Sequence, residues 1–303
     1  MKLKNTFRFP SLVLASLLLC SSWTAAQVTT ITSEPELIAI LQSDGAAADK
    51  AMACKRLAIY GSEKCVTDVG KLLRDEQLSS WARITLEAIP GKESSQVLRE
   101  AASSVKGRLL IGVLNSIGVR RDVDSVDVLA MHVTDSDAGV ASAAAVALGR
   151  IGTETSTEVL KKSMAKVGDE VRSAVAEGLV LSAEASMMQG KLDYAKDIYD
   201  SVRSAKVPQQ RIVEATRGAI LSRKTAGIPL LLEELRAPEY FRFQLGLSVA
   251  RELEGREVDQ ALASELSKAP ADRAALILVA MADRPATVDV QAIIKAVAAE
   301  AKP

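Results

Sequence analysis

Residues that could carry acid–base chemistry are few in this sequence of 303 residues, which contains a single histidine, His132. Histidine is the side chain most suited to proton transfer near neutral pH. No nucleophile is placed beside His132, and one histidine is too few for a zinc site. In the repeat pattern of the chain His132 aligns with Leu72, so we expect a half-buried ring in a leucine position. The alternative is a pH-sensitive contact on a binding face.

Aspartates cluster at two places where they could bind calcium or form an acid–base pair: Asp122 with Asp124 and Asp127, and Asp135 with Asp137. Neither cluster has the spacing of a calcium loop. Both fall at expected turns and helix starts, where aspartate caps backbone N–H groups. The sequence also lacks a glycine-rich phosphate loop, a Gly-x-Ser-x-Gly elbow and a Cys-x-x-Cys pair. We therefore predict no catalytic residue, no metal ligand and no cofactor.

Two cysteines, Cys54 and Cys65, lie close together in the sequence. In an exported protein they could form one disulfide that closes a short loop. They could equally be two small, partly buried residues that never pair. The sequence leaves both alternatives open.

The main aromatic cluster is Tyr240-Phe241-Arg242-Phe243, at the expected start of a helix. Aromatic residues and arginine are enriched at binding hot spots, which makes this cluster the first candidate for a binding patch, together with His132. The alternative is that its rings fill the core, where aromatic residues are often found.

The composition favours a helical protein without a nucleic-acid partner. Hydrophobic residues make up 48% of the chain but aromatic residues only 3%, so the core must be built mainly from small and aliphatic side chains. Alanine and leucine are strong helix formers, whereas strands favour aromatic and β-branched residues. The 38 basic and 38 acidic residues balance, so there is no basic excess of the kind that binds nucleic acid.

The first 26 residues have the pattern of a cleaved signal peptide. Lys2, Lys4 and Arg8 precede a short apolar run from Leu12 to Leu19, and the small residues at 24–26 offer a cleavage site. The run is shorter than the roughly 20 residues of a membrane span. Leu19 is larger than the residue that a lipoprotein signal requires before its cysteine, so we do not expect a lipid on Cys20. We predict export to the periplasm or the extracellular space, with no membrane span in the mature chain.

A repeat of about 30 residues runs through the chain, which is the length of a helical hairpin in repeat proteins. Each unit has a helix with an apolar stripe, a polar turn, and a second, alanine-rich helix that ends near a glycine. The second helices are Ala53-x-x-x-Leu57-x-x-Tyr60-Gly61, Ala82-x-x-x-Leu86-x-x-Ile89, Leu110-x-x-x-Leu114-x-x-Ile117-Gly118 and Ala144-x-x-x-Leu148-x-x-Ile151-Gly152. First helices include Val66-x-x-Val69-x-x-Leu72 and Val126-x-x-Leu129-x-x-His132.

This pattern resembles the HEAT-repeat family, especially the short HEAT-like repeats of the phycobilisome-lyase type. The resemblance rests on the Val-x-x-Leu first helices, the aspartate at the turn and the Ala-x-x-x-Leu-Gly second helices. Asp169-Glu170-Val171-Arg172 is similar to the Asp-x-Val-Arg turn of the family, whereas Ala141 replaces the arginine in the preceding unit. The resemblance covers roughly residues 34–300 and implies an all-α solenoid of stacked antiparallel helix hairpins. In a stack, alanines let helices approach closely.

The repeat pattern divides the mature chain into three parts. Residues 27–183 hold clear HEAT-like repeats. Residues 184–218 form either one tetratricopeptide-like hairpin or a degenerate HEAT-like hairpin that uses Tyr194 and Tyr199 in its core. Residues 219–303 hold degenerate HEAT-like repeats and end in a single helix from Val290 to Val297.

Together these features predict an exported, non-catalytic scaffold that binds a protein partner on the solenoid surface. The first alternative is an enzyme of the bilin-lyase type, which the resemblance implies. The second is a structural protein that spaces other components of the cell envelope.

Overall fold

The computed structural model describes residues 33–284 and residue 294. The predicted signal peptide, and the predicted terminal helix apart from Ile294, lie outside the described residues. Within them the chain is helical and contains no β-strand. The α-helices are α1 (Glu34–Gln42), α2 (Ala47–Tyr60), α3 (Val66–Lys71), α4 (Ser79–Ala88), α5 (Lys92–Ala102), α6 (Gly107–Arg120), α7 (Val126–His132), α8 (Ala138–Ile151), α9 (Glu154–Met164), α10 (Asp169–Met188), α11 (Leu192–Arg203), α12 (Gln209–Ser222), α13 (Ile228–Arg236), α14 (Tyr240–Glu252), α15 (Arg256–Leu266) and α16 (Ala271–Ala282).

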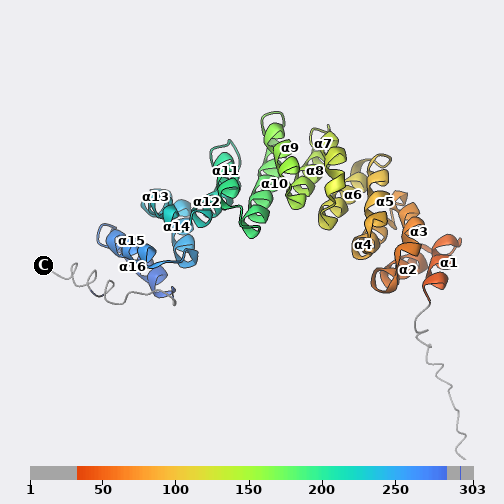
Figure 1. Ribbon diagram of the computed structural model, residues 1–303, viewed down its shortest axis with the longest axis horizontal. Coiled ribbons are helices and arrows are strands. Elements are labelled where there is room, and N and C mark those ends of the chain that lie inside the picture. Colours follow the sequence, from red (N-terminus) through yellow and green to blue (C-terminus); the bar gives the residue numbers. More distant parts are fainter. Residues whose placement is uncertain (1–32, 285–293, 295–303) are drawn as a thin grey trace, which may run out of the picture.

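The helices are arranged as a stack of hairpins. Each odd-numbered helix packs on the even-numbered helix that follows it, and each even-numbered helix also packs on the next even-numbered one. Figure 1 shows the stack as an arch, with the even-numbered helices along its inner side and most odd-numbered helices along its outer side. The predicted all-α solenoid is therefore confirmed.

The ends of α8 show how the sequence sets the helix boundaries. Asp137 precedes α8, and its carboxylate accepts hydrogen bonds from the backbone N–H groups of Gly139 (2.8 Å) and Val140 (3.3 Å). Gly152 follows α8 with φ +64°, the left-handed conformation that glycine adopts without strain. Capping was therefore the correct interpretation of Asp137. Asp122 differs, because its carboxylate pairs with the guanidinium of Arg99.

Small residues bring α8 close to its neighbours on both sides. The alanines at 141, 143, 144, 145 and 147 are all buried in α8, together with Leu148. Gly149 packs on the backbone of α10: a Cβ built on it would lie 2.4 Å from the Cα of Gly178. Gly118 of α6 is in similar contact with α8, because a Cβ built on Gly118 would lie 2.8 Å from the Cα of Ala147. The alanine-rich sequence of α8 thus reflects two close helix crossings.

The buried side chains form two apolar cores that meet in α12. The first extends from Leu37 to Ala219, and the second from Ile220 to Met281. The predicted boundary at 183/184 falls inside α10, and the hairpin after it consists of α11 and α12. Tyr199 is buried in that hairpin and packs on Gly218.

Two arginines, each at or just after the end of an inner helix, donate hydrogen bonds to carbonyl oxygens at the end of the previous inner helix. Arg120, at the end of α6, donates to the carbonyl oxygens of Leu86 (2.5 Å), Ile89 (2.7 Å) and Gly91 (2.6 Å), and its Nε donates to Ser95 Oγ (2.9 Å). These carbonyls lie at and just beyond the end of α4, where a helix leaves acceptors without partners.

Arg284 repeats this arrangement after α16. It donates to the carbonyl oxygens of Ala250, Leu253 (2.5 Å) and Gly255 (3.3 Å) at the end of α14, and its Nε donates to Asp259 Oδ1 at 2.7 Å. We refer to the two sets as arginine clamps. They differ in the partner of Nε, which is a neutral hydroxyl in the first and a buried carboxylate in the second.

Candidate interaction surfaces

The predicted aromatic cluster is divided between the surface and the core. Tyr240 and Phe241 are exposed at the start of α14, whereas Phe243 is fully buried. The guanidinium of Arg273 lies 4.6 Å from the centre of the Phe243 ring, a cation–π contact with the following inner helix. Phe243 therefore fills the core, as the alternative predicts, whereas Tyr240 and Phe241 remain candidates for a binding patch.

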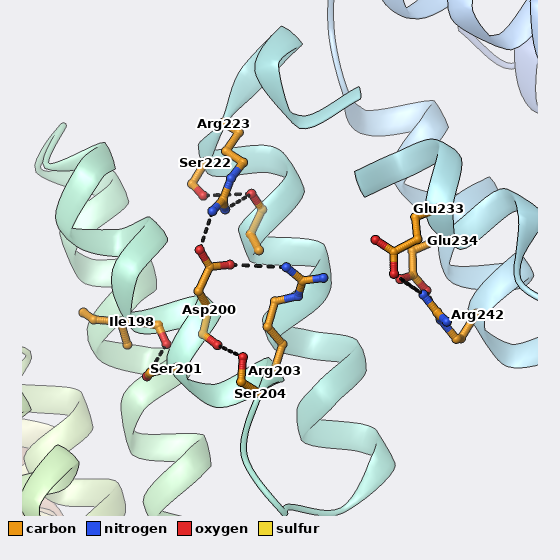
Figure 2. Close-up of polar contacts among 11 residues, drawn as sticks. Ile198, Asp200, Ser201, Arg203, Ser204, Ser222, Arg223, Glu233, Glu234 and Arg242 are labelled. Carbon is orange, nitrogen blue, oxygen red and sulfur yellow. Dashed lines mark hydrogen bonds and ion pairs between the residues drawn. The ribbon is translucent and has the colours of Figure 1, made fainter. Parts of the chain in front are cut away.

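Arg242 is held by carboxylates of its own hairpin. It donates from Nε and Nη2 to Glu234 (2.8 and 2.7 Å) and from Nη2 to Glu233 (2.9 Å), as Figure 2 shows. The hydrogen bonds to Glu234 raise the pKa of Arg242 above its usual value, although burial opposes this. Arg242 joins α13 to α14, so Tyr240 and Phe241 are what remains of the predicted patch for a partner.

His132 ends α7 and is half-buried, as its alignment with Leu72 predicts. Its Nδ1 lies 3.3 Å from Asp135 Oδ2. The pKa of Asp135 is lowered first by the N–H of Asp137 and then by His132. These three residues line a surface hollow of about 520 Å³ with the exposed Met131. The hollow lies on α7 and the aromatic cluster on α14, so the two predicted binding features do not form one patch.

Cys54 and Cys65 are both buried, and both are free thiols in the structure. Cys65 Sγ is 3.2 Å from the carbonyl oxygen of Ser62, and the carbonyl oxygen of Cys54 accepts a hydrogen bond from Thr85 Oγ1 at 2.9 Å. Burial raises the pKa of each thiol from 9.0 to about 11. Thiolate, the reactive form, is therefore scarce at neutral pH.

We expect Cys54 and Cys65 to resist Ellman's reagent at pH 8 in the folded protein and to react fully in denaturant. In a Cys20→Ser variant these two are the only cysteines of the sequence, so the assay counts them alone. Their raised pKa values also stabilise the fold below pH 9, and this contribution is lost as the pH rises through 11. Two reactive thiols that appear before unfolding would contradict their burial, and none after unfolding would indicate a disulfide.

The middle of the inner side is covered by ion pairs between its own helices. Arg211 of α12 pairs with Glu177 of α10 at 2.5 Å, and Arg217 of α12 pairs with Glu252 of α14. In these ion pairs each arginine is compensated by a carboxylate of a neighbouring inner helix. The neighbouring hairpin is joined similarly, because Asp200 of α11 accepts from both Arg203 and Arg223, as Figure 2 shows.

The first third of the inner side is different, and the sequence analysis did not identify it. Large apolar side chains are exposed there on three successive inner helices. We define the N-terminal inner surface by these residues and the basic residues among them: Met52, Lys55, Ile59, Trp81, Arg83, Ile84, Arg108 and Val119. The available signal was the spacing of Met52, Lys55 and Ile59 at three, four and seven residues, and of Trp81 and Ile84 at three, opposite the buried stripe of each helix.

The described residues contain no group of three or more histidine, cysteine or acidic side chains placed to hold a metal ion. Among these same residues, none of the helices is both long enough and apolar enough to span a bilayer.

Comparison with known proteins identifies repeats in the central part of the chain. The family model for HEAT repeats matches residues 107–180. No curated protein matches the sequence significantly. A solved structure of an engineered protein is 16% identical, with 88% of this chain and 82% of that chain covered and a TM-score of 0.43.

Two natural proteins are also among the similar structures. Human deoxyhypusine hydroxylase is 18% identical, with 79% of this chain and 90% of that chain covered and a TM-score of 0.39. The CpcE and CpcF complex of phycocyanin lyase from Nostoc is 16% identical, with 90% and 97% covered and a TM-score of 0.37.

The matched residues 107–180 run from α6 into α10, through the closest helix crossings of the stack. Hairpins of the same construction continue on both sides of them. The described chain is an all-α solenoid, and its central residues 107–180 match the model for HEAT repeats.

Proposed function

We propose that the protein is an exported, non-catalytic scaffold that binds a protein partner on the inner side of its arch. The observation that carries this proposal is the row of exposed apolar side chains on α2, α4 and α6. Met52 is 50% exposed, Ile84 49% and Val119 51%. Soluble proteins seldom leave contiguous apolar surface in water unless it binds something.

The construction of the solenoid supports the same role. Inner helices present equivalent residues at regular intervals, so one extended partner can contact several repeats at once. Met52 and Trp81 occupy the same position in successive repeats, as do Lys55 and Ile84. The signal-peptide pattern in residues 1–26 supports export, which places the partner in the periplasm or envelope.

Affinity capture from an envelope extract tests the proposal. We expect the full chain to retain one stoichiometric partner, and a Trp81→Glu/Ile84→Glu variant to lose it, because both substitutions place charge in the contact. Val123→Glu is the matched control: Val123 is exposed just before α7, outside this surface, so the variant should retain the partner.

Two other outcomes would contradict the proposal. Many weakly retained proteins that both variants keep would favour a spacer in the envelope. A coloured covalent adduct after incubation with a bilin would favour a lyase.

A further inference from the structure

Charge distinguishes the N-terminal inner surface from the rest of the inner side. Helices α2, α4 and α6 contain more basic than acidic residues. The basic residues are Lys50, Lys55, Arg56, Arg83, Arg108 and Arg120, and the acidic residues are Asp49 and Glu87. Of these, Lys55, Arg83 and Arg108 belong to the N-terminal inner surface as defined above, which therefore combines apolar side chains with positive charge.

Three of these basic residues have no carboxylate partner. Within the part of the chain that the structure describes, Lys55, Arg83 and Arg108 form no ion pair. Arg83 lies over Gly112 and makes polar contacts with the Gly112 carbonyl oxygen (3.3 Å) and Ser116 Oγ (3.4 Å), both neutral groups. Lys55 and Arg108 are exposed. Their charges are available to a ligand.

The later inner helices show how the same fold neutralises such charges. Arg211 and Arg217 each pair with a glutamate of a neighbouring inner helix, and Arg251 of α14 pairs with Asp283 at 2.7 Å. The middle and the end of the inner side thus supply their own counter-charges. Among the described residues, Lys55, Arg83 and Arg108 have no such ion pair.

We propose that the N-terminal inner surface binds an acidic, amphipathic segment of the protein partner. This rests on the proposed function and specifies the chemistry of the partner. Apolar side chains of the segment would cover Trp81, Ile84 and Met52. Its carboxylates would pair with Lys55 and Arg108, where a partly desolvated ion pair also selects against basic or neutral segments.

An anionic membrane is the other ligand that apolar and basic residues could suit. The shape of the arch disfavours it, because the inner helices line its hollow side and a flat bilayer would meet the two ends of the arch first (Figure 1). A peptide segment can enter the arch and follow its curvature. The geometry therefore favours a protein ligand.

Selection from a random peptide library displayed on phage, with the full chain immobilised, tests this inference. We expect the enriched peptides to carry net negative charge together with apolar residues. An enriched peptide without tryptophan is then synthesised and titrated into a Trp23→Phe variant, in which Trp81 is the remaining tryptophan. Its emission should shift to shorter wavelength, because Trp81 is 37% exposed before the peptide covers it.

Charge reversal locates the site. We expect Lys55→Glu/Arg108→Glu to weaken binding of the peptide at least tenfold. The matched control is Lys162→Glu/Lys206→Glu, which reverses two exposed charges outside this surface and should bind as the parent does. A peptide in which lysine replaces the acidic residues should prefer the reversed variant.

Several results would overturn the inference. These are neutral or basic enriched peptides, no enriched peptide, binding that Lys55→Glu/Arg108→Glu leaves unchanged, or binding to phosphatidylglycerol vesicles alone. The partner captured from the envelope could be lost with Trp81→Glu/Ile84→Glu but retained with Lys55→Glu/Arg108→Glu. That result would support the scaffold function and refute the inference that the bound segment is acidic.

Discussion

Replacing Gly149 with valine is expected to destabilise the protein by about 3 kcal/mol or more, because α8 and α10 touch at this residue. A Cβ on Gly149 would lie 2.4 Å from both the Cα and the carbonyl oxygen of Gly178. Both atoms belong to the backbone of α10, so no side-chain rotation can relieve the overlap. The helices must separate or the hairpin must shift.

The contact is reciprocal, which strengthens the expectation. A Cβ on Gly178 would lie 2.5 Å from the carbonyl oxygen of Ala145 in α8. Neighbouring residues leave no compensating space, because Leu148 and Val175 are fully buried in the same region. Separating the two helices would also open the apolar core on both sides of the crossing and lose its packing contacts.

Thermal melts followed by circular dichroism at 222 nm measure this effect. Ser142→Val is the matched control, because it adds valine to the same helix at a partly exposed position, and serine and valine have similar helix propensities. Gly149→Ala should fall between this control and Gly149→Val. If Gly149→Val melts at the temperature of the control, α8 and α10 are not in contact here.

The repeat frame that predicts α8 could not predict this crossing. Alternation of apolar residues every three or four positions shows which face of a helix is buried. It does not show which neighbour covers each part of that face. Gly149 and Gly178 belong to different repeats, and their contact depends on the angle and offset between two inner helices.

The candidate surfaces were harder to predict than the fold for a related reason. Tyr240, Phe241 and Phe243 are adjacent and chemically alike, yet the helical turn directs the third ring into the core. Arg242 binds Glu233 and Glu234 because the short turn before α14 folds these residues back against it. The sequence shows the partners but not the turn that joins them.

The N-terminal inner surface was missed for the opposite reason. Its apolar residues share the periodicity of core residues, and sequence reasoning assigns such residues to the core. Trp81 and Ile84 of α4 are nevertheless exposed. The sequence shows that these residues lie opposite the buried stripe of their helix, but whether another helix covers that face depends on the assembled stack.

Removing the guanidinium of Arg284 is expected to cost about 3–5 kcal/mol, the usual result of breaking a buried ion pair. The side chains of Arg284 and Asp259 are 3% and 2% exposed and meet at 2.7 Å. Among the described residues the second carboxylate oxygen of Asp259 accepts no hydrogen bond, so Arg284 is the main counter-charge of Asp259. In Arg284→Met the carboxylate would remain buried without it.

The other arginine clamp provides a control within the same molecule. Arg120 binds the equivalent carbonyl oxygens of α4, but its Nε donates to the neutral Ser95. Arg120→Met should therefore cost less, about 1–2 kcal/mol, because it removes hydrogen bonds without leaving a buried charge. The difference between the two losses of stability measures the cost of burying Asp259 without a counter-charge, because both variants lose the hydrogen bonds to the helix end.

Hydrogen exchange of α15 and α16, together with urea unfolding, measures the effect where it arises, since a repeat at the end of a stack can open locally. Adding Asp259→Leu to Arg284→Met should restore most of the lost stability, because an apolar pair replaces a buried charge. Equal losses in Arg284→Met and Arg120→Met would show that the clamps act through the carbonyl oxygens alone. No recovery in the double variant would show that Asp259 is stabilised by other groups.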